Sequence, residues 1–446
     1  MKTTRQITFD TLMRVFYDGA YSNIAIDKAI TEQKFSKTDA AFTTALYYGV
    51  LERAIQLDFA ISKYLKKPIT SIDKEIILIL RIGFYQLLYM NGVPDNSSVD
   101  ESVKLCPYAK KTSAKSFVNA VLRNFLRDKK QIEYPDIKKD ELAYYSAFYA
   151  CPRWLLGLWR KQYGIENAVE FAKAGLISPP LTIRVNTLKT TSDKLIGYLL
   201  NKGINAKKHP LLSECLILTQ SGSIDKSPQY RQGLFYVQDI ASQLCAMELA
   251  VSKGDTVLDI CSAPGSKAFT IAQEMENDGV IYAFDLFEHK LKLIEQSAKR
   301  LDISIIKTAI QDGSIFNKEI LLADKVLCDV PCSGLGIIRR KPEIKYKTYD
   351  EIADLPEIQF AILQNSSKYV KSGGTIIYST CTLNKHENQE IVMKFLENNS
   401  DFSIGTLSET VNNIANIDNG FATFFPSENG DNGASDGFFI AKLIKK

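Results

Sequence analysis

Hydrophobic positions in the first 130 residues recur at intervals of three and four. The run TTALYYGVLERAIQLDFAISKYL, residues 43–65, shows this spacing clearly, and a repeat near 3.6 residues is typical of an amphipathic helix. Residues 128–140 are charged and contain Pro135, which predicts a linker because proline interrupts regular structure. The pattern therefore predicts an all-helical domain over residues 1–130.

The pattern changes over residues 141–235, where a short helical stretch precedes a mixture of helix and strand. Two segments, LTIRVNTLK (181–189) and ECLILT (214–219), are typical of strands, and SDKLIGYLLNKG (192–203) between them has a helical period. We expect connecting helices followed by a small α+β module similar to an RRM.

Strands and helices alternate through residues 236–446. Predicted strands lie at 255–261, 279–285, 303–312, 324–330 and 373–381, and amphipathic helices at 266–275, 289–301 and 357–370. Repeated βα units with continuous apolar strands predict an α/β fold with a doubly wound, Rossmann-like parallel sheet. The tail has a Gly/Asn/Asp-rich loop and a final strand, which we expect to complete a sheet edge as a hairpin.

Composition places the chain among globular proteins and narrows its chemistry. The 446 residues are 45% hydrophobic and 24% charged, and the net charge is +4. Arg81 and Gln86 interrupt the longest apolar run, residues 76–90, so no membrane span is expected. The eight cysteines form no CxxC pair, and the N-terminus has no signal-peptide pattern. We expect a cytoplasmic protein without disulfides or a metal.

A small-residue loop follows the first predicted strand of the last region. A ligand in a doubly wound sheet binds beyond the carboxyl ends of the strands, and the loop LDICSAPGSKAF, residues 258–269, lies there. It matches neither the dinucleotide nor the nucleoside triphosphate fingerprint. Three acids at successive strand ends, Asp259, Asp285 and Asp312, would repel phosphates but suit a nucleoside and a sulfonium cation. S-adenosylmethionine fits that description.

Two cysteines also fall at predicted strand ends on the ligand side. Cys332 lies in DVPCSG, where Asp329 and Pro331 precede it, and Cys381 lies in YSTCTLN. A thiol at such a position is a nucleophile if its pKa is lowered. One cysteine there would be typical of the core, whereas two at strand ends favour chemistry.

Five motifs carry a resemblance to a known family. The stretches QDIASQLCAMEL, VLDICSAPGSK, DVPCSGLGIIRRKPEIKY, SGGTIIYSTCTLNKHENQEIV and DGFFIAKL resemble the RNA (cytosine-5)-methyltransferase family, the Sun/Fmu group. FVNAVLRNF near the N-terminus resembles the helical RNA-binding fold of the antitermination factor NusB. One departure lies in the loop, where the family has Pro-Gly-Gly-Lys-Thr and this chain has Ser266 and Ala268. A serine fits only if φ at that position is not strongly positive.

The resemblance implies domains over residues 1–130 (NusB-like), 141–235 (connecting module) and 236–446 (methyltransferase). It implies that Cys381 is the nucleophile that attacks carbon 6 of cytosine and that Cys332 assists release of the adduct. Asp329 would contact either the cytosine or the cofactor. The remaining residues expected to bind S-adenosylmethionine are Cys261, Ser262, Ala263, Pro264, Gly265, Ser266, Lys267, Asp285 and Asp312.

The resemblance also implies an RNA substrate, and the NusB-like domain favours 16S ribosomal RNA over transfer RNA. Candidate phosphate contacts are Lys110, Lys111, Arg123, Arg339, Arg340 and Lys341. We expect a monomer that binds neither DNA nor membrane. Two alternatives stay open: a transfer RNA cytosine-5 methyltransferase, and a non-catalytic RNA-binding or antitermination factor in which residues 1–130 do the work.

Overall fold

The computed structural model describes residues 2–219, 224–426 and 435–446, and the chain divides into two compact units. Unit 1 comprises Met1–Ile177 and Ile338–Lys347, and unit 2 comprises Ser178–Ile337 and Thr348–Lys446. Within the described ranges, no helix combines the length and hydropathy needed to cross a membrane.

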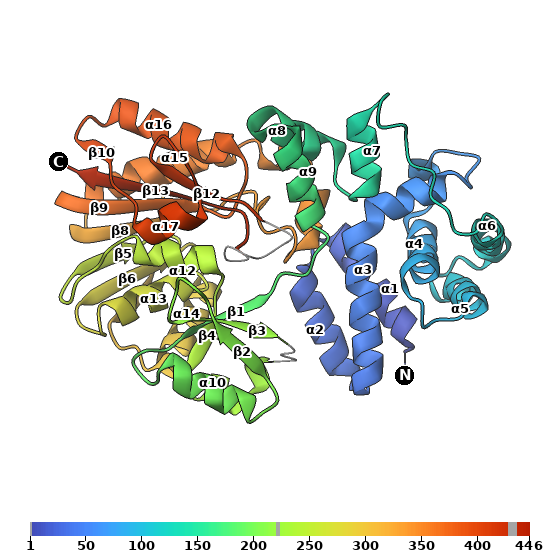
Figure 1. Ribbon diagram of the computed structural model, residues 1–446, viewed down its shortest axis with the longest axis horizontal. Helices are drawn as coiled ribbons and strands as arrows, with labels where there is room; N and C mark the ends of the chain where they lie inside the picture. The colour runs from blue at the N-terminus through green and yellow to red at the C-terminus, as the bar shows by residue number, and fades with distance from the viewer. Residues whose placement is uncertain (1, 220–223, 427–434) are drawn as a thin grey trace. The chain divides into compact units, whose positions relative to one another are not determined.

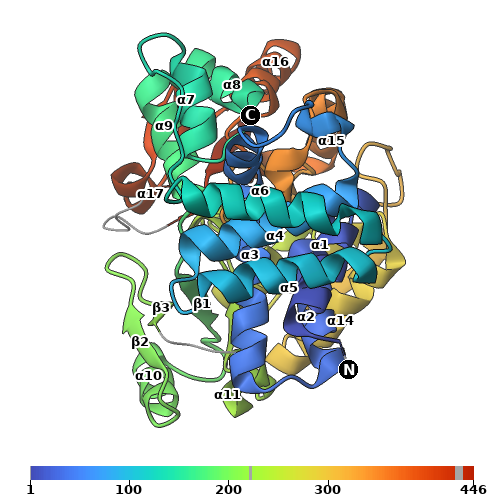
Figure 2. The same cartoon turned by 90° about the vertical axis from the view of Figure 1, so that its right-hand side faces the viewer.

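Unit 1 is helical, as the hydrophobic spacing predicted. Helix α6 shows why: Val118, Val121, Leu122 and Phe125 are buried on one face, and Phe125 stacks on Phe84 at 4.3 Å between ring centroids. Figure 2 shows α4, α5 and α6 side by side. The helices of unit 1 are α1 (Thr4–Asp18), α2 (Ser22–Gln33), α3 (Lys37–Ser62), α4 (Lys74–Tyr89), α5 (Asp95–Tyr108), α6 (Lys115–Arg127), α7 (Glu141–Phe148), α8 (Arg153–Tyr163) and α9 (Ile165–Ala174).

A short segment from late in the sequence completes unit 1. Residues 338–347, which contain the 3₁₀ turn Pro342–Tyr346, pack among the N-terminal helices. The Tyr346 ring lies 5.1 Å from that of Phe16, and Glu343 accepts a hydrogen bond from the Ser22 backbone N–H at 3.0 Å. The expected domains therefore differ from the compact units in two places, because residues 141–177 and 338–347 both fall in unit 1.

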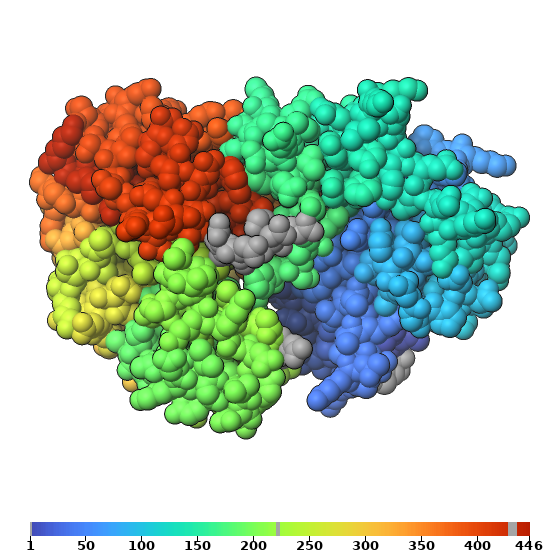
Figure 3. Space-filling view, viewed as in Figure 1, coloured from blue at the N-terminus to red at the C-terminus, as the bar shows by residue number. Residues whose placement is uncertain are grey.

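The small module of unit 2 contains the expected strands and helix and two further strands. Its antiparallel sheet has the order β2-β3-β1-β4, and it forms the green lobe in Figure 3. Ile183, Val185, Leu216 and Phe235 from the sheet are buried together with Leu195 and Leu199 from the helix. The bounds are β1 (Leu181–Val185), α10 (Ser192–Leu200), β2 (Asn205–Lys208), β3 (Cys215–Thr219), α11 (Pro228–Arg231) and β4 (Phe235–Val237).

The second sheet of unit 2 contains the predicted parallel strands. Its order is β11-β12-β13-β9-β8-β5-β6-β7, and β10 also pairs with β13. The strands β9, β8, β5, β6 and β7 are parallel neighbours, so their carboxyl ends share one edge. The bounds are β5 (Thr256–Asp259), β6 (Val280–Asp285), β7 (Ile306–Ile310), β8 (Ala323–Asp329), β9 (Val370–Thr380), β10 (Phe402–Ile404), β11 (Asn416–Asp418), β12 (Phe421–Phe424) and β13 (Phe438–Lys445).

Helices cover both faces of this sheet, as Figure 1 shows, because successive residues of its strands are apolar on both sides. Val257 packs with the core that contains Ala272 and Ile294, whereas Leu258 packs with the core that contains Ile362 and Val392. The helices are α12 (Ile240–Met247), α13 (Ser266–Glu274), α14 (Glu288–Leu301), α15 (Leu355–Ser366), α16 (Gln389–Asn398) and α17 (Glu409–Ile414).

The end of the chain departs from the expected edge hairpin. β13 does pair antiparallel with β12, but it also pairs antiparallel with β9, so it lies inside the sheet. Its apolar residues are buried on both faces, which is the reason it does not form an edge. The predicted Gly/Asn/Asp-rich loop falls mainly on residues 427–434, outside the described residues.

Candidate active site

The carboxyl edge of the parallel strands gathers the residues that the sequence singled out. Asp259, Asp285 and Asp329 end β5, β6 and β8, and Cys381 follows the last residue of β9. Asp312 and Cys332 lie in the loops directly after β7 and β8. These residues are spread over more than a hundred positions of the chain, and the parallel strands bring them to one edge of the sheet.

The loop after β5 bends sharply before α13. Gly265 has φ of 97°, and a Cβ at this position would lie 2.8 Å from the Phe269 ring, so only glycine fits here. The Ala263–Pro264 peptide bond is cis. Ser266 is the first residue of α13 and is absent from the described non-glycine residues with positive φ. The serine that departs from the family motif therefore occupies an ordinary helical position, and the loop tolerates it.

Two of the acids are held by their own loops. Asp285 is buried and accepts a hydrogen bond from the Phe287 N–H at 3.1 Å, with Lys290 Nζ 3.4 Å away. Asp312 accepts from the N–H of Ser314 at 2.9 Å and from its hydroxyl at 2.7 Å. These short-range contacts orient both carboxylates without a distant partner.

Asp259 lies deeper than the other acids. It is 1% exposed, and neither carboxylate oxygen has a hydrogen-bond partner among the described residues. Burial raises the pKa of this carboxyl to about 7, because the charged form is disfavoured away from water. A buried polar group with unfilled hydrogen-bonding capacity beside a glycine-lined loop fits a polar ligand at this edge.

Lys267 and Asp329 connect the start of α13 to the end of β8, the strand that precedes Cys332. Lys267 Nζ lies 2.6 Å from Asp329 Oδ2, and the Ser379 hydroxyl donates to Asp329 Oδ1 at 2.8 Å. Burial opposes the charged ammonium, but the Asp329 carboxylate outweighs it and raises the pKa of Lys267. Lys267 therefore stays charged and fixes the orientation of Asp329.

The two cysteines are in contact. Their sulfur atoms lie 3.2 Å apart, and both side chains are partly exposed. The hydrogen bond with Cys381, reinforced by burial, raises the pKa of Cys332 well above that of an ordinary thiol. The raised pKa keeps Cys332 a thiol at ordinary pH, and its sulfur lies within hydrogen-bond distance of the Cys381 sulfur.

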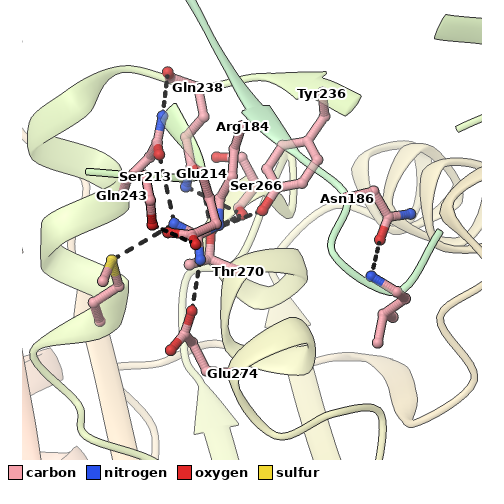
Figure 4. A network of polar contacts seen from close by, with 12 residues as sticks. Arg184, Asn186, Ser213, Glu214, Tyr236, Gln238, Gln243, Ser266, Thr270 and Glu274 are labelled. Carbon is pink, nitrogen blue, oxygen red and sulfur yellow. Dashed lines mark hydrogen bonds and ion pairs between the residues drawn. The ribbon is translucent and has the colours of Figure 1, made fainter. Parts of the chain in front are cut away.

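A polar network that the sequence did not predict fixes helix α13 to the small module (Figure 4). Arg184 on β1 is fully buried and pairs with Glu274 on α13 at 2.6 Å. Near the start of α13, Gln238 donates to the carbonyl of Ser266 at 3.2 Å and accepts from Thr270 at 2.9 Å. The available signal was an arginine inside the otherwise apolar strand pattern LTIRV.

The candidate phosphate contacts lie in unit 1 and differ in surroundings. Lys110 and Arg123 are exposed, whereas Lys111 is half-buried beside Asp73 at 2.6 Å. The other three precede the 3₁₀ turn of residues 342–346: Arg339 is 7% exposed, and Arg340 and Lys341 are half-buried. The predicted basic surface is thus partly neutralised by acids of its own domain.

Comparisons with known proteins agree with this arrangement. Three family models match: 16S rRNA methyltransferase RsmB/F over residues 246–444, the NusB family over 2–127, and an RsmF/B-like ferredoxin-like domain over 151–225. The chain is 34% identical to a probable ribosomal RNA small subunit methyltransferase B of Bacillus subtilis, and 31% identical to one of Synechocystis. Each alignment covers 100% of both chains.

Solved structures share the fold. The crystal structure of PH0851 has a TM-score of 0.83 at 24% identity and covers 100% of this chain and 99% of that one. A methyltransferase homologue from Pyrococcus horikoshii has a TM-score of 0.60 at 28% identity and covers 69% of this chain and 99% of that one. The predicted NusB-like domain and the Rossmann-like methyltransferase fold are confirmed.

Proposed function

Since the chain belongs to the 16S rRNA methyltransferase RsmB/F family, we propose that it methylates carbon 5 of a cytosine in 16S ribosomal RNA through a covalent cysteine adduct. The chain is an RNA methyltransferase, and its cofactor is S-adenosylmethionine. The observation that carries the covalent step is the contact between Cys332 and Cys381, 3.2 Å apart at the strand edge. One thiol on the ligand side can add to the base, and a second thiol in contact with it can assist release of the adduct.

The loop after β5 and the acids beside it form the cofactor site in this proposal. Residues 261–267, Asp285 and Asp312 would hold S-adenosylmethionine, which supplies an electrophilic methyl group. Asp285 suits a ribose hydroxyl because it ends the strand that follows the loop. Asp329 is held by Lys267 and Ser379, so we assign it to the boundary between cofactor and base.

The cysteines divide the reaction between them. Cys381 adds as a thiolate to carbon 6 of cytosine, forming an S–C bond, and the electron pair of the 5,6 double bond lets carbon 5 take the methyl group of S-adenosylmethionine. The bond between that methyl group and the sulfonium sulfur would break, and its electron pair would leave with S-adenosylhomocysteine. The carbon-5 proton then passes to solvent, the double bond re-forms, and the S–C bond breaks to return the thiolate. Cys332, held protonated beside this sulfur, donates its S–H to the departing thiolate.

RNA contacts are proposed for unit 1. Lys110, Lys111 and Arg123 lie on the helical domain that matches the NusB family, and Arg339, Arg340 and Lys341 lie on the segment that packs with it. Basic side chains there would neutralise phosphates and give a salt-dependent affinity. We propose that the enzyme acts as a monomer in the cytoplasm, where all eight thiols, which are free in the structure, stay reduced.

The two cysteine variants test the covalent step. Cys381→Ser should lose methyl transfer and form no adduct, because a hydroxyl is a much weaker nucleophile than a thiolate. Cys332→Ala should still attack and methylate, and then remain bound to RNA through Cys381. A denaturing gel should therefore show a protein–RNA band for Cys332→Ala alone, and the double variant should show none.

The opposite gel pattern would assign the attack to Cys332. Active variants of both kinds without any band would exclude covalent catalysis. Bisulfite sequencing of 16S ribosomal RNA and transfer RNA from a deletion strain decides the substrate: loss of a methylated cytosine in transfer RNA alone would replace the 16S assignment. Calorimetry with S-adenosylmethionine tests the non-catalytic alternative: the enzyme should bind the cofactor, whereas a non-catalytic RNA-binding factor should not.

A further inference from the structure

The buried carboxylate of Glu387 connects the two loops that carry Cys332 and Cys381. Glu387 ends the 3₁₀ turn Lys385–Glu387 and is 0% exposed. Its Oε1 accepts hydrogen bonds from the Ser333 hydroxyl at 2.5 Å and from Asn384 at 3.0 Å. Its Oε2 accepts from the Ser333 N–H at 2.8 Å and from Gln359 at 2.9 Å. Four donors from three parts of the chain thus converge on one buried side chain.

These contacts hold the backbone on both sides of Cys332. Ser333 follows Cys332 and is fixed to Glu387 through its N–H and its hydroxyl. Pro331 precedes Cys332, and its carbonyl accepts a hydrogen bond at 2.9 Å from the same Gln359 amide that donates to Glu387. The sulfur of Cys332 is therefore carried on a segment whose two neighbours are both tied to Glu387, one of them through Gln359.

The residues on both sides of Cys381 are held in a similar way by Asn388, which follows Glu387 in the chain. The Thr380 hydroxyl donates to Asn388 Oδ1 at 2.5 Å, and Asn388 Nδ2 donates to the Thr382 carbonyl at 2.9 Å. The two loops are then joined directly, because the hydroxyls of Ser333 and Thr382 lie 2.7 Å apart. A second bridge runs from the Gly336 N–H to the Cys381 carbonyl at 3.0 Å.

A fully buried carboxylate is costly unless its hydrogen bonds compensate for lost hydration. An apolar residue of similar volume would leave the donors of Ser333, Gln359 and Asn384 unsatisfied, and each unsatisfied donor also costs stability. The buried carboxylate is compatible with a stable fold only when all of these hydrogen bonds are made together. A complete network of this kind fixes the positions of the segments attached to it. What is attached here is the pair of cysteines.

We propose that Glu387 is a positioning residue that sets the distance between the sulfurs of Cys332 and Cys381. Among the described contacts, no hydrogen bond joins it to either sulfur, so it sets their positions through Ser333 and Thr382. Its charge also contributes, after the Cys381 hydrogen bond and burial, to the raised pKa of Cys332. Its role in the reaction rests on the proposed function, because sulfur separation matters for release only if Cys332 donates to the thiolate that leaves the base. The geometric role itself does not depend on that chemistry.

Mild oxidation of the intact protein measures the separation of the sulfurs without any RNA. Diamide takes up two electrons and two protons from the two thiols, becomes the hydrazine, and leaves a Cys332–Cys381 disulfide that peptide mass spectrometry detects. Glu387→Gln replaces one acceptor oxygen by a donor that faces existing donors. We expect this variant to form the disulfide about 10-fold to 100-fold more slowly, because a misplacement of reacting groups by about 1 Å can cost up to about 100-fold in rate.

Glu248→Gln is the matched control. Glu248 is also a buried carboxylate of unit 2, but it accepts from the Ser408 N–H and lies near Lys442. Its substitution should leave the rate of disulfide formation unchanged. If Glu387→Gln does not fold, Ser333→Ala removes the hydroxyl between Glu387 and Thr382 and should slow the same reaction by a smaller factor.

Two measurements test the effect of Glu387→Gln on catalysis: steady-state kinetics of RNA methylation, and the rate of adduct formation in the Cys332→Ala variant. Glu387→Gln should lower kcat for RNA methylation with little change in KM for RNA or in cofactor affinity by calorimetry. It should also slow adduct formation in Cys332→Ala, because the contact between Ser333 and Thr382 ties the loop of Cys381 to Glu387 as well. Unchanged disulfide and adduct rates would overturn the role of Glu387 while the proposed function stands. Slower disulfide formation with no adduct in any variant would keep the geometric role and overturn the covalent mechanism.

Discussion

The two halves of the strand edge are built in different ways. On the side where we propose that the cofactor binds, called the cofactor half, Asp285 and Asp312 are oriented by residues two positions away, Phe287 and Ser314. On the cysteine side, the neighbours of Cys332 are held by Gln359 and Glu387, which lie 28 and 54 residues from their partners Pro331 and Ser333. Asp285 and Asp312 are therefore oriented by their own loops, whereas the segment that carries Cys332 is oriented by contacts between distant parts of the chain.

The difference agrees with what each half must do. A cofactor site that uses backbone turns tolerates small changes in packing, because each turn fixes its own carboxylate. In the proposed mechanism, a pair of thiols that shares a proton tolerates little, because their contact depends on two separate loops. Three substitutions test where the boundary between these halves lies, beginning with the largest expected effect.

Asp259 tests how far burial on the cofactor side costs stability. Its pKa is about 7 in the folded protein and about 3.9 in an unfolded chain. Between these values the folded state binds one more proton, so the wild type loses about 1.4 kcal/mol of stability per pH unit as the pH rises. Asp259→Asn should lack this loss.

Urea unfolding of the cofactor-free protein at a series of pH values from 5 to 8 measures this difference. The advantage of Asp259→Asn over the wild type should grow with pH and level off above pH 7. A difference that is constant with pH would show that Asp259 titrates alike in both states, and that its oxygens find partners when the protein folds.

Lys267 tests the connection between the two halves. Lys267→Met leaves the Asp329 carboxylate without its cation, 2.6 Å away in the wild type. Breaking a buried pair costs about 3–5 kcal/mol, and we expect about 2–3 kcal/mol because Asp329 is partly exposed. Urea unfolding measures the change. Lys371→Met removes the more exposed partner of Asp324 and should cost less than about 1 kcal/mol; equal losses would contradict a special role for Lys267.

Asp285 tests the independence of the cofactor half. Asp285→Ala should weaken S-adenosylmethionine binding by about 10-fold to 30-fold, since hydrogen bonds to a charged group contribute about 1.5–2 kcal/mol. Its oxygens are held by Phe287 within the same loop, so RNA affinity and the rate of diamide oxidation at the cysteines should not change. Calorimetry that finds unchanged cofactor affinity would remove Asp285 from the site.

Local patterns in the sequence predicted most of the catalytic fold. Continuous apolar runs ending in Asp259, Asp285 and Asp329 placed the parallel strands, and the alternation of strand and helix placed the acids and cysteines at one edge. The prediction failed for β13, which lies inside the sheet between β12 and β9. A final strand buried on both faces cannot be distinguished by its period from an edge strand.

The sequence by itself determined the elements, the edge at which the chemistry gathers, and the family. Each of these depends on residues close together in the chain or on short motifs. Three contacts were decided by the tertiary structure alone. Arg184 holds helix α13 through Glu274, and residues 338–347 pack with unit 1. Glu387 ties together the two loops that carry the cysteines. These contacts join segments far apart in the sequence, and no local spacing encodes which buried polar group will meet which partner until the chain has folded.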